Sequence, residues 1–228
     1  MGKTSTREFY ENKLRDTIVR DAMLLERENN GETKFIKTYL DQYPRYIRRE
    51  LHKYFWKNEK VMSKIYTQYK KQEEEGPYNI FIFGNAARGK TVFACCLSLY
   101  MQYRVFLDKR EKNPDYPYLI PKLKLCTEGS ILENLQDKIA SGKSASTAEY
   151  KTIPFMVLDD LGATKPTDWG LSQMYLIMNQ RLLDIVPTIL TANKSLEELI
   201  DFYQNDRLVH RLYGVQVQAK DLGVFEIL

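Results

Sequence analysis

The sequence predicts a three-layer α/β fold built around a parallel β-sheet. Short apolar runs recur along residues 79–228 and alternate with stretches of helical periodicity. This is the pattern of strands that are buried on both faces and joined by helices. A Gly-containing loop follows the first apolar run, and a pair of aspartates follows the third. Strands that alternate with helices are joined by right-handed crossovers, so we expect a single parallel sheet covered by helices.

The elements of this fold are expected after residue 76. Strands are predicted at residues 79–83, 123–126, 155–158 and 188–191, with short strands near 215–218 and 224–227. Helices are predicted at residues 89–110, 129–140, 169–184, 195–203 and 206–212. The Ser-, Gly- and Lys-rich residues 141–148 are expected to form a loop before the third strand.

A different pattern fills the first third of the chain. Two helical stretches are predicted at residues 7–28 and 45–71. The polar run at residues 70–77 ends in a Gly-Pro pair, which indicates a boundary. We therefore expect a helical N-terminal segment over residues 1–75 and the α/β domain over residues 76–228.

The positive charge of the chain is concentrated in the N-terminal segment. The net charge is +4, and residues 1–75 hold 17 Lys and Arg against 13 Asp and Glu, whereas the later residues hold 17 of each. The mixture of basic and aromatic residues at 43–57 suits contact with a protein partner or with nucleic acid. Aromatic residues at helical spacing also pack cores, and the sequence leaves both interpretations open.

Composition argues against several classes of protein. No apolar run approaches the ~20 residues that a membrane helix needs, and the charged start of the chain is unlike a secretory signal. The three cysteines, Cys95, Cys96 and Cys126, have the spacing of neither a metal site nor a disulfide framework. We expect buried thiols in a reducing cytosol, and hence a cytoplasmic protein with no membrane contact.

One loop motif predicts nucleotide binding. Residues 84–91 match G-x-x-x-x-G-K-[ST] in full, between a buried strand and a helix. The backbone amides of such a loop and the N-terminus of the helix bind phosphates. Lys90 is expected to reach the β- and γ-phosphates of ATP, and the Thr91 hydroxyl is expected to bind Mg²⁺. The predicted nucleotide contacts are Gly84, Asn85, Ala86, Ala87, Arg88, Gly89, Lys90, Thr91 and Val92.

The two aspartates at the end of the third strand complete this predicted site. The apolar residues 155–158 deliver Asp159 and Asp160 to the carboxyl edge of the sheet, where ligands of α/β folds bind. Asp159 is expected to hold Mg²⁺, and Asp160 is expected to orient and polarise the water that attacks ATP. Glu is common in the second role, so the shorter Asp160 is expected to slow hydrolysis without abolishing it.

Two further positions are candidates for catalysis. Asn193 follows the fourth strand and is expected to help position the attacking water, although an isolated Asn there would more often cap a helix. Arg207 and Arg211 lie four residues apart on one helical face. Arg211 is favoured over Arg207 as an arginine finger that completes the site of a neighbouring subunit. Arg181 is another candidate for this role, but arginines on helix surfaces are common, so it is interpreted as one of these and left aside.

Together these motifs resemble the DnaC/DnaI/IstB branch of the AAA+ ATPases, which comprises helicase loaders and transposition helpers of bacteria and phages. The resemblance covers about residues 78–214, and four blocks in order carry it: residues 83–85, 157–162, 187–193 and 207–212. The loop departs from the family pattern, because Ala86-Ala87-Arg88 stands where small residues and a Gly-Thr or Gly-Val pair are usual.

The resemblance implies an AAA+ P-loop NTPase core with a reduced or absent C-terminal lid, which uses ATP and Mg²⁺. The predicted arginine finger implies a homo-oligomer when ATP is bound. The resemblance further implies a helicase loader of DNA replication. Such a protein would bind a DnaB-like hexameric replicative helicase through residues 1–75 and single-stranded DNA through the core. DNA or the partner is expected to stimulate hydrolysis.

Three alternative functions stay open. An IstB-like transposition helper would use the same ATPase core on double-stranded DNA. A small-molecule kinase would need an acceptor pocket and an Arg-rich lid, and residues 108–121 are too short and too mixed in character to supply one. A non-hydrolysing switch protein would bind metal and nucleotide without turnover, so ATP hydrolysis with and without DNA separates it from the enzymes.

Overall fold

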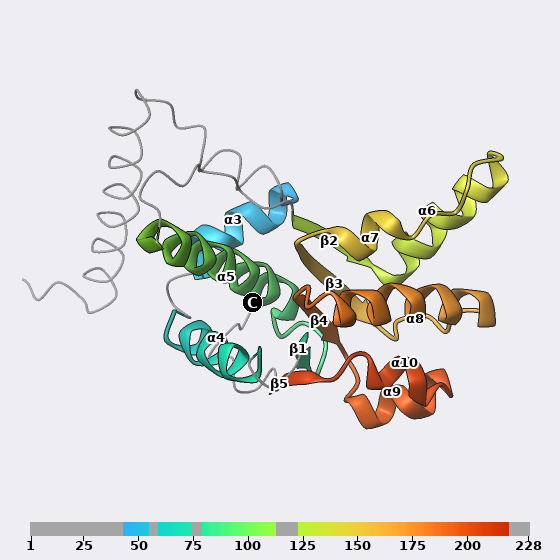
Figure 1. The fold of residues 1–228 in the computed structure, drawn as a ribbon. Coiled ribbons are helices and arrows are strands. Elements are labelled where there is room, and N and C mark those ends of the chain that lie inside the picture. Colours follow the sequence, from blue (N-terminus) through green and yellow to red (C-terminus); the bar gives the residue numbers. More distant parts are fainter. Residues whose placement is uncertain (1–42, 55–58, 74–78, 113–122, 219–228) are drawn as a thin grey trace, which may run out of the picture. The chain divides into compact units, whose positions relative to one another are not determined.

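The computed structural model describes residues 43–54, 59–73, 79–112 and 123–218. The chain divides into two compact units, Met1–Arg48 and Arg49–Leu228, and the second unit holds the β-sheet (Figure 1). The predicted helix at residues 7–28 and the predicted strand at residues 224–227 lie outside the described part of the chain.

Five parallel strands form a single sheet in the order β2-β3-β4-β1-β5 (Figure 1). The strands are β1 (Asn79–Phe83), β2 (Leu123–Thr127), β3 (Phe155–Leu161), β4 (Thr188–Ala192) and β5 (Gly214–Gln218). All five were expected at these places in the sequence. β4 is buried throughout, and four of the five residues of β1 are buried, as expected for strands covered on both faces.

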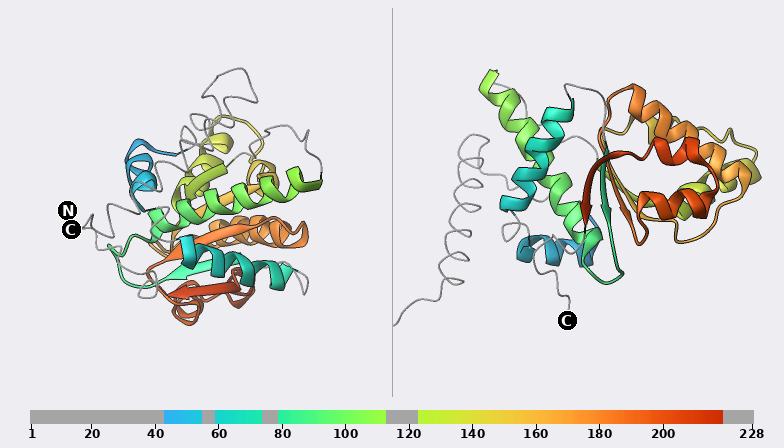
Figure 2. Two further views of the ribbon diagram at one scale, coloured as in Figure 1. Left: turned by 90° about the vertical axis from the view of Figure 1, so that its left-hand side faces the viewer. Right: turned by 90° about the horizontal axis from the view of Figure 1, so that it is seen from below.

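Helices cover both faces of this sheet. They are α4 (Glu59–Glu73), α5 (Lys90–Lys112), α6 (Glu128–Ala140), α7 (Ala148–Thr152), α8 (Asp168–Leu183), α9 (Leu196–Tyr203) and α10 (Asp206–His210). Figure 2 shows α4 and α5 on one face, with α6, α8, α9 and α10 on the other. The predicted three-layer α/β fold is therefore confirmed.

Two details of the helices differ from expectation. The range 45–71 holds two helices, α3 (Arg45–Tyr54) and α4, of which α4 packs against α5 and β5. The second difference is α7, which lies at the end of the predicted loop and has only five residues. A helix of little more than one turn carries too few residues for a periodic signal. Among the described helices, none combines the length and apolar character needed to span a membrane.

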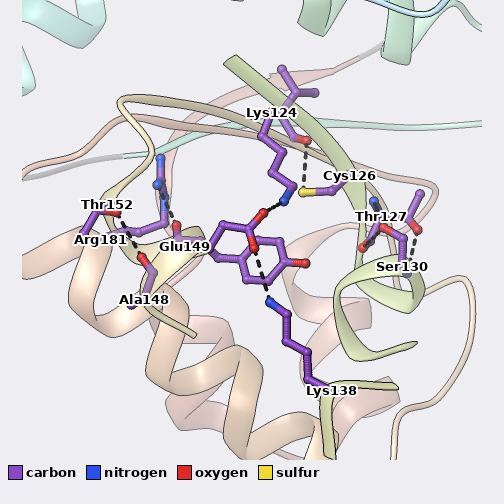
Figure 3. Close-up of polar contacts among 11 residues, drawn as sticks. Lys124, Cys126, Thr127, Ser130, Lys138, Ala148, Glu149, Thr152 and Arg181 are labelled. Carbon is purple, nitrogen blue, oxygen red and sulfur yellow. Dashed lines mark hydrogen bonds and ion pairs between the residues drawn. The ribbon is translucent and has the colours of Figure 1, made fainter. Parts of the chain in front are cut away.

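Short polar interactions fix where the helices begin. The side chains of Thr127, Thr167 and Ser195 accept hydrogen bonds from the backbone at the starts of α6, α8 and α9. On the surface, Glu149 of α7 accepts hydrogen bonds from Lys124 of β2 and Lys138 of α6 (Figure 3). All three side chains are partly exposed, so this network contributes little to stability.

The outer strand β5 depends on a close approach between two backbones. A Cβ added to Gly214 would lie 1.8 Å from the carbonyl oxygen of Asn79, its neighbour across the strand pair. The buried Asn79 side chain also donates to the carbonyl of Arg211 at 2.7 Å. Residue 214 must therefore be glycine for β5 to pair with β1 in this register.

Arg181 of α8 is buried, which corrects its interpretation as a helix-surface residue. Its side chain is 0% exposed and donates four hydrogen bonds at 2.7–2.9 Å. The acceptors are the Thr188 hydroxyl and the carbonyls of Tyr150, Ile153 and Pro187. Burial lowers the pKa of the guanidinium to about 10. Arg181 thus joins the segments that lead into β3 and β4.

Replacing Arg181 by Met is expected to lower the free energy of unfolding by about 3 kcal/mol, because four buried acceptors lose their donor. Urea denaturation followed by circular dichroism measures this change. The exposed Arg207 provides the control, because Arg207→Met is expected to change stability by less than about 0.5 kcal/mol. Equal stability of the two variants would contradict a structural role for Arg181.

Candidate nucleotide-binding site

The predicted site lies at the carboxyl edge of the sheet, where β1, β3 and β4 end. Strand β4 lies between β1 and β3, so Asn193, which follows it, lies between the loop after β1 and the acids of β3. The loop at residues 84–89 joins β1 to α5, and its residues 85–88 are exposed. The three separate segments that the sequence assigned to one site therefore meet at one edge of the sheet.

The loop backbone adopts an unusual conformation at Ala87. Its φ is 58°, in the left-handed region, as are the φ angles of the flanking Gly84 and Gly89 at 133° and 71°. A side chain in this region is strained by roughly 1–2 kcal/mol. Ala87 stands at the place of the glycine in the usual Gly-Thr or Gly-Val pair. Ala87 in place of the usual glycine thus adds a side chain, while the loop keeps a backbone conformation typical of glycine.

Lys90, at the first turn of α5, is held by three oxygen atoms. Its Nζ donates to the carbonyls of Gly84 at 2.9 Å and Asn85 at 2.7 Å, and to Asn193 Oδ1 at 2.8 Å. The residue is only 8% exposed. Burial lowers the pKa of Lys90, while the nearby charges of Asp160 and Asp159 oppose this shift. A cation in this position is suited to bind phosphate groups at the loop.

Thr91 and Asp159 supply oxygen atoms suited to a magnesium ion. The Thr91 hydroxyl donates to Asp159 at 2.9 Å and 3.0 Å from its two carboxylate oxygens. In the described part of the chain, no group of three or more His, Cys, Asp or Glu residues is arranged to hold a metal. Mg²⁺ in nucleotide sites is commonly held by one or two protein groups together with phosphates and water. The pair therefore fits Mg²⁺ that arrives with ATP.

Asp160 lies in a bulge of β3. Pairing between β3 and β4 runs from Leu158–Leu190 to Leu161–Ala192, so two residues of β3 lie opposite Thr191 alone. Asp160 has a φ of 56°, and its N–H donates to the Thr191 hydroxyl at 3.0 Å. Bulges are common beside active sites because they redirect a side chain.

Asn193 connects the loop lysine to the second acid. Its Oδ1 accepts from Lys90 at 2.8 Å, and its Nδ2 donates to Asp160 Oδ1 at 3.0 Å. Lysine can only donate and an ionised carboxylate can only accept, so these two contacts fix the orientation of the amide. Asn193 is therefore in contact with both functional groups between which the sequence placed it.

The remaining predicted contacts differ in their surroundings. Val92 is buried in α5, and its role as a nucleotide contact stays a prediction. Arg211 lies at the opposite side of the sheet from the site, where the strands begin. Its carbonyl accepts a hydrogen bond from the side chain of Asn79, the first residue of β1. Phe83, the last residue of β1 before the loop, lies roughly 13 Å further along the strand. Arg211 is thus not brought to the site of its own chain.

The side chain of Arg211 contacts α8 within the same chain. Its Nε donates to Asn179 Oδ1 at 2.8 Å, and its guanidinium lies 5.8 Å from the centre of the Tyr175 ring. Arg207 is exposed. The role of Arg211 as an arginine finger for a neighbouring subunit stays a prediction.

Two residues that the sequence did not single out support the turn after Asp160. Gly162 donates its N–H to Glu128 at 3.4 Å, and its carbonyl accepts from Lys194 at 2.8 Å. Burial raises the pKa of Glu128, which also accepts a hydrogen bond from Tyr203 at 2.7 Å. No local motif marks these residues, because they come from α6 and from the loop after β4.

The cysteines take no part in the site. Cys95, Cys96 and Cys126 are all buried, and none of them forms a disulfide bond. Burial raises the pKa of the Cys96 and Cys126 thiols, the latter to about 12. Such thiols are unreactive, and the predicted buried state is confirmed.

Comparison with known proteins finds similarity among solved structures. No protein-family model matches the sequence, and no curated protein does. The chain is similar to a structure of the DnaC helicase loader, with 16% identity, a TM-score of 0.46, and coverage of 82% of this chain and 99% of that chain. It is also similar to a primosome component from Streptococcus pyogenes, with 20% identity, a TM-score of 0.49, and coverage of 70% and 77%.

A third similar structure is AMPPCP-bound DnaA from Aquifex aeolicus, with 21% identity and a TM-score of 0.47. The match covers 63% of this chain and 41% of that one, so the chain spans less than half of the DnaA structure. DnaC and DnaI, which the sequence motifs resemble, are both among the similar structures. Because these TM-scores lie below 0.5, function is inferred from the chain's own motifs and geometry.

Proposed function

We propose that this chain is a Mg-ATP-dependent ATPase that acts as a loader of a hexameric replicative helicase in DNA replication. One observation carries the ATPase part. The loop lysine Lys90, Asn193 and Asp160 form a continuous chain of hydrogen bonds at the carboxyl edge of the sheet, beside the Thr91–Asp159 pair. The order of the four sequence blocks supports the loader part.

Binding of ATP would use the loop and the start of α5. The backbone amides of the loop and the N-terminus of the 23-residue helix α5 are suited to bind phosphates. Lys90 would exchange its bonds to the loop carbonyls for bonds to the phosphates. Thr91 and Asp159 would hold Mg²⁺, which supplies positive charge that stabilises the transferring phosphoryl group.

Hydrolysis would depend on Asp160 and Asn193. Asp160 accepts a hydrogen bond from Asn193 through Oδ1, which leaves its other oxygen to accept a proton from an attacking water. Asn193 lies within hydrogen-bond distance of both Lys90 and Asp160. It can therefore respond to phosphate bound at Lys90 and to water bound at Asp160. Turnover is the property that distinguishes this proposal from a non-hydrolysing switch.

The partner contacts follow from the resemblance. Residues 1–75 would dock on the helicase, and the ATPase core would bind single-stranded DNA. All of the +4 net charge lies in residues 1–75, which is compatible with contact between that segment and a polyanion. Arg211 would reach the nucleotide of a neighbouring subunit, so ATP is expected to favour a homo-oligomer.

The full chain is expected to co-purify with a hexameric replicative helicase in the presence of ATP, and the complex is expected to retain single-stranded DNA. Pull-down on the tagged helicase, with and without ATP, measures both the capture of the chain and the retention of single-stranded DNA. Lys90→Ala is the control, because it removes the phosphate-binding amine and should abolish any dependence on ATP. No capture of the helicase, together with tight binding to duplex DNA, would contradict the loader proposal and favour a transposition helper.

Arg211→Ala is expected to lower turnover by about 10³-fold while Mg-ATP still binds, because an arginine finger stabilises charge only in the transition state. Asn179→Ala provides a matched control that breaks the same Arg211–Asn179 bond but keeps the guanidinium. Steady-state kinetics and equilibrium binding of Mg-ATP, measured for both variants, separate a catalytic role of Arg211 from a structural one.

Mixing of subunits tests the finger directly. Arg211→Ala subunits keep an intact loop, and Lys90→Ala subunits keep an intact finger, so a mixture should recover turnover that neither variant has alone. Absence of recovery, with equal losses in Arg211→Ala and Asn179→Ala, would assign Arg211 a structural role.

A further inference from the structure

Thr191 of β4 makes two hydrogen bonds to the acidic pair of the site. It is 1% exposed and lies opposite the bulge that contains Asp159 and Asp160. Its Oγ1 lies 2.5 Å from Asp159 Oδ1 and 3.0 Å from the backbone nitrogen of Asp160. One hydroxyl group thus contacts both residues to which the site owes its negative charge.

The direction of each bond follows from the chemistry of the partners. The N–H of Asp160 can only donate, so the Thr191 oxygen accepts there and its own hydrogen remains available. An ionised Asp159 can only accept, so the hydroxyl donates to it. A separation of 2.5 Å is normal for a hydroxyl bound to a carboxylate, which is one of the stronger hydrogen bonds in proteins. No aliphatic side chain supplies either contact.

These contacts act on the metal-binding and the catalytic acid in different ways. Asp159 is held between the hydroxyls of Thr191 and Thr91, which fixes the plane of its carboxylate. Asp160 is held through its backbone in a left-handed conformation that is unfavourable for a residue with a side chain. Loss of the backbone contact would let Asp160 relax and move its carboxylate away from Asn193.

We propose that Thr191 is a positioning residue for ATP hydrolysis, whose hydroxyl aligns the Asp159 carboxylate for Mg²⁺ and holds the bulge that directs Asp160 toward Asn193. This role rests on the proposed ATPase function. Thr191 touches neither nucleotide nor metal in this role, and acts through the two aspartates. Groups that orient metal ligands commonly change metal affinity by 10–100-fold when they are removed.

Thr191→Val tests the role, because valine has nearly the same shape as threonine without the hydroxyl. The variant is expected to need about tenfold more Mg²⁺ for half-maximal binding of a fluorescent ATP analogue. Its kcat is expected to fall at least tenfold at saturating Mg-ATP. Binding of the analogue in EDTA is expected to stay unchanged, because the loop and Lys90 are intact. Thr191→Ser, which keeps the hydroxyl, should restore both the Mg²⁺ dependence and kcat.

Thr188→Val provides the matched control. Thr188 is also a buried threonine of β4, but its hydroxyl accepts from Arg181, outside the site. This variant should lose thermal stability while it keeps the Mg²⁺ dependence and kcat of the wild type. Normal Mg²⁺ dependence and kcat in Thr191→Val would overturn the proposal, as would equal defects in Thr188→Val. A wild-type chain that neither binds nor hydrolyses Mg-ATP would instead overturn the proposed ATPase function.

Discussion

The position of β4 between β1 and β3 is the constraint on which the candidate site depends. Each strand ends in a polar group at the same edge of the sheet: the loop after β1, Asn193 after β4, and the aspartates of β3. Because β4 is central, one short amide side chain reaches both Lys90 and Asp160. A sheet with β1 and β3 as direct neighbours would leave no strand between the lysine and the acids to supply such a link.

Two residues of the site adopt conformations that the backbone alone would not favour. Ala87 and Asp160 both have left-handed φ angles, and each lies at a point where the chain must bring a functional group to the edge of the sheet. Strain of this kind persists only where surrounding contacts determine the conformation. At Asp160 these contacts come from Thr191 and Asn193, while Glu128 and Lys194 hold the following glycine. The acidic strand β3, β4 and the start of α6 therefore form one functional unit.

The sequence predicts most of the fold because strands buried on both faces have a simple signature, and all five described strands lie where apolar runs were found. The loop motif and the two aspartates were local enough to identify. Thr191, Glu128 and Lys194 were not, because their roles arise from a bulge and from contacts between elements distant in sequence. Arg181 was misread for a related reason: its acceptors lie in other segments, so nothing near it in the sequence signals burial.

The most direct test of the central claim is isothermal titration calorimetry of the wild-type chain with a non-hydrolysable ATP analogue, in Mg²⁺ and in EDTA. The geometry of Lys90, Thr91 and Asp159 predicts saturable binding of one nucleotide per chain, with tighter binding in Mg²⁺. Absence of binding in both conditions would contradict the assignment of this edge of the sheet as a nucleotide site. Equal affinity with and without Mg²⁺ would contradict the role given to Thr91 and Asp159.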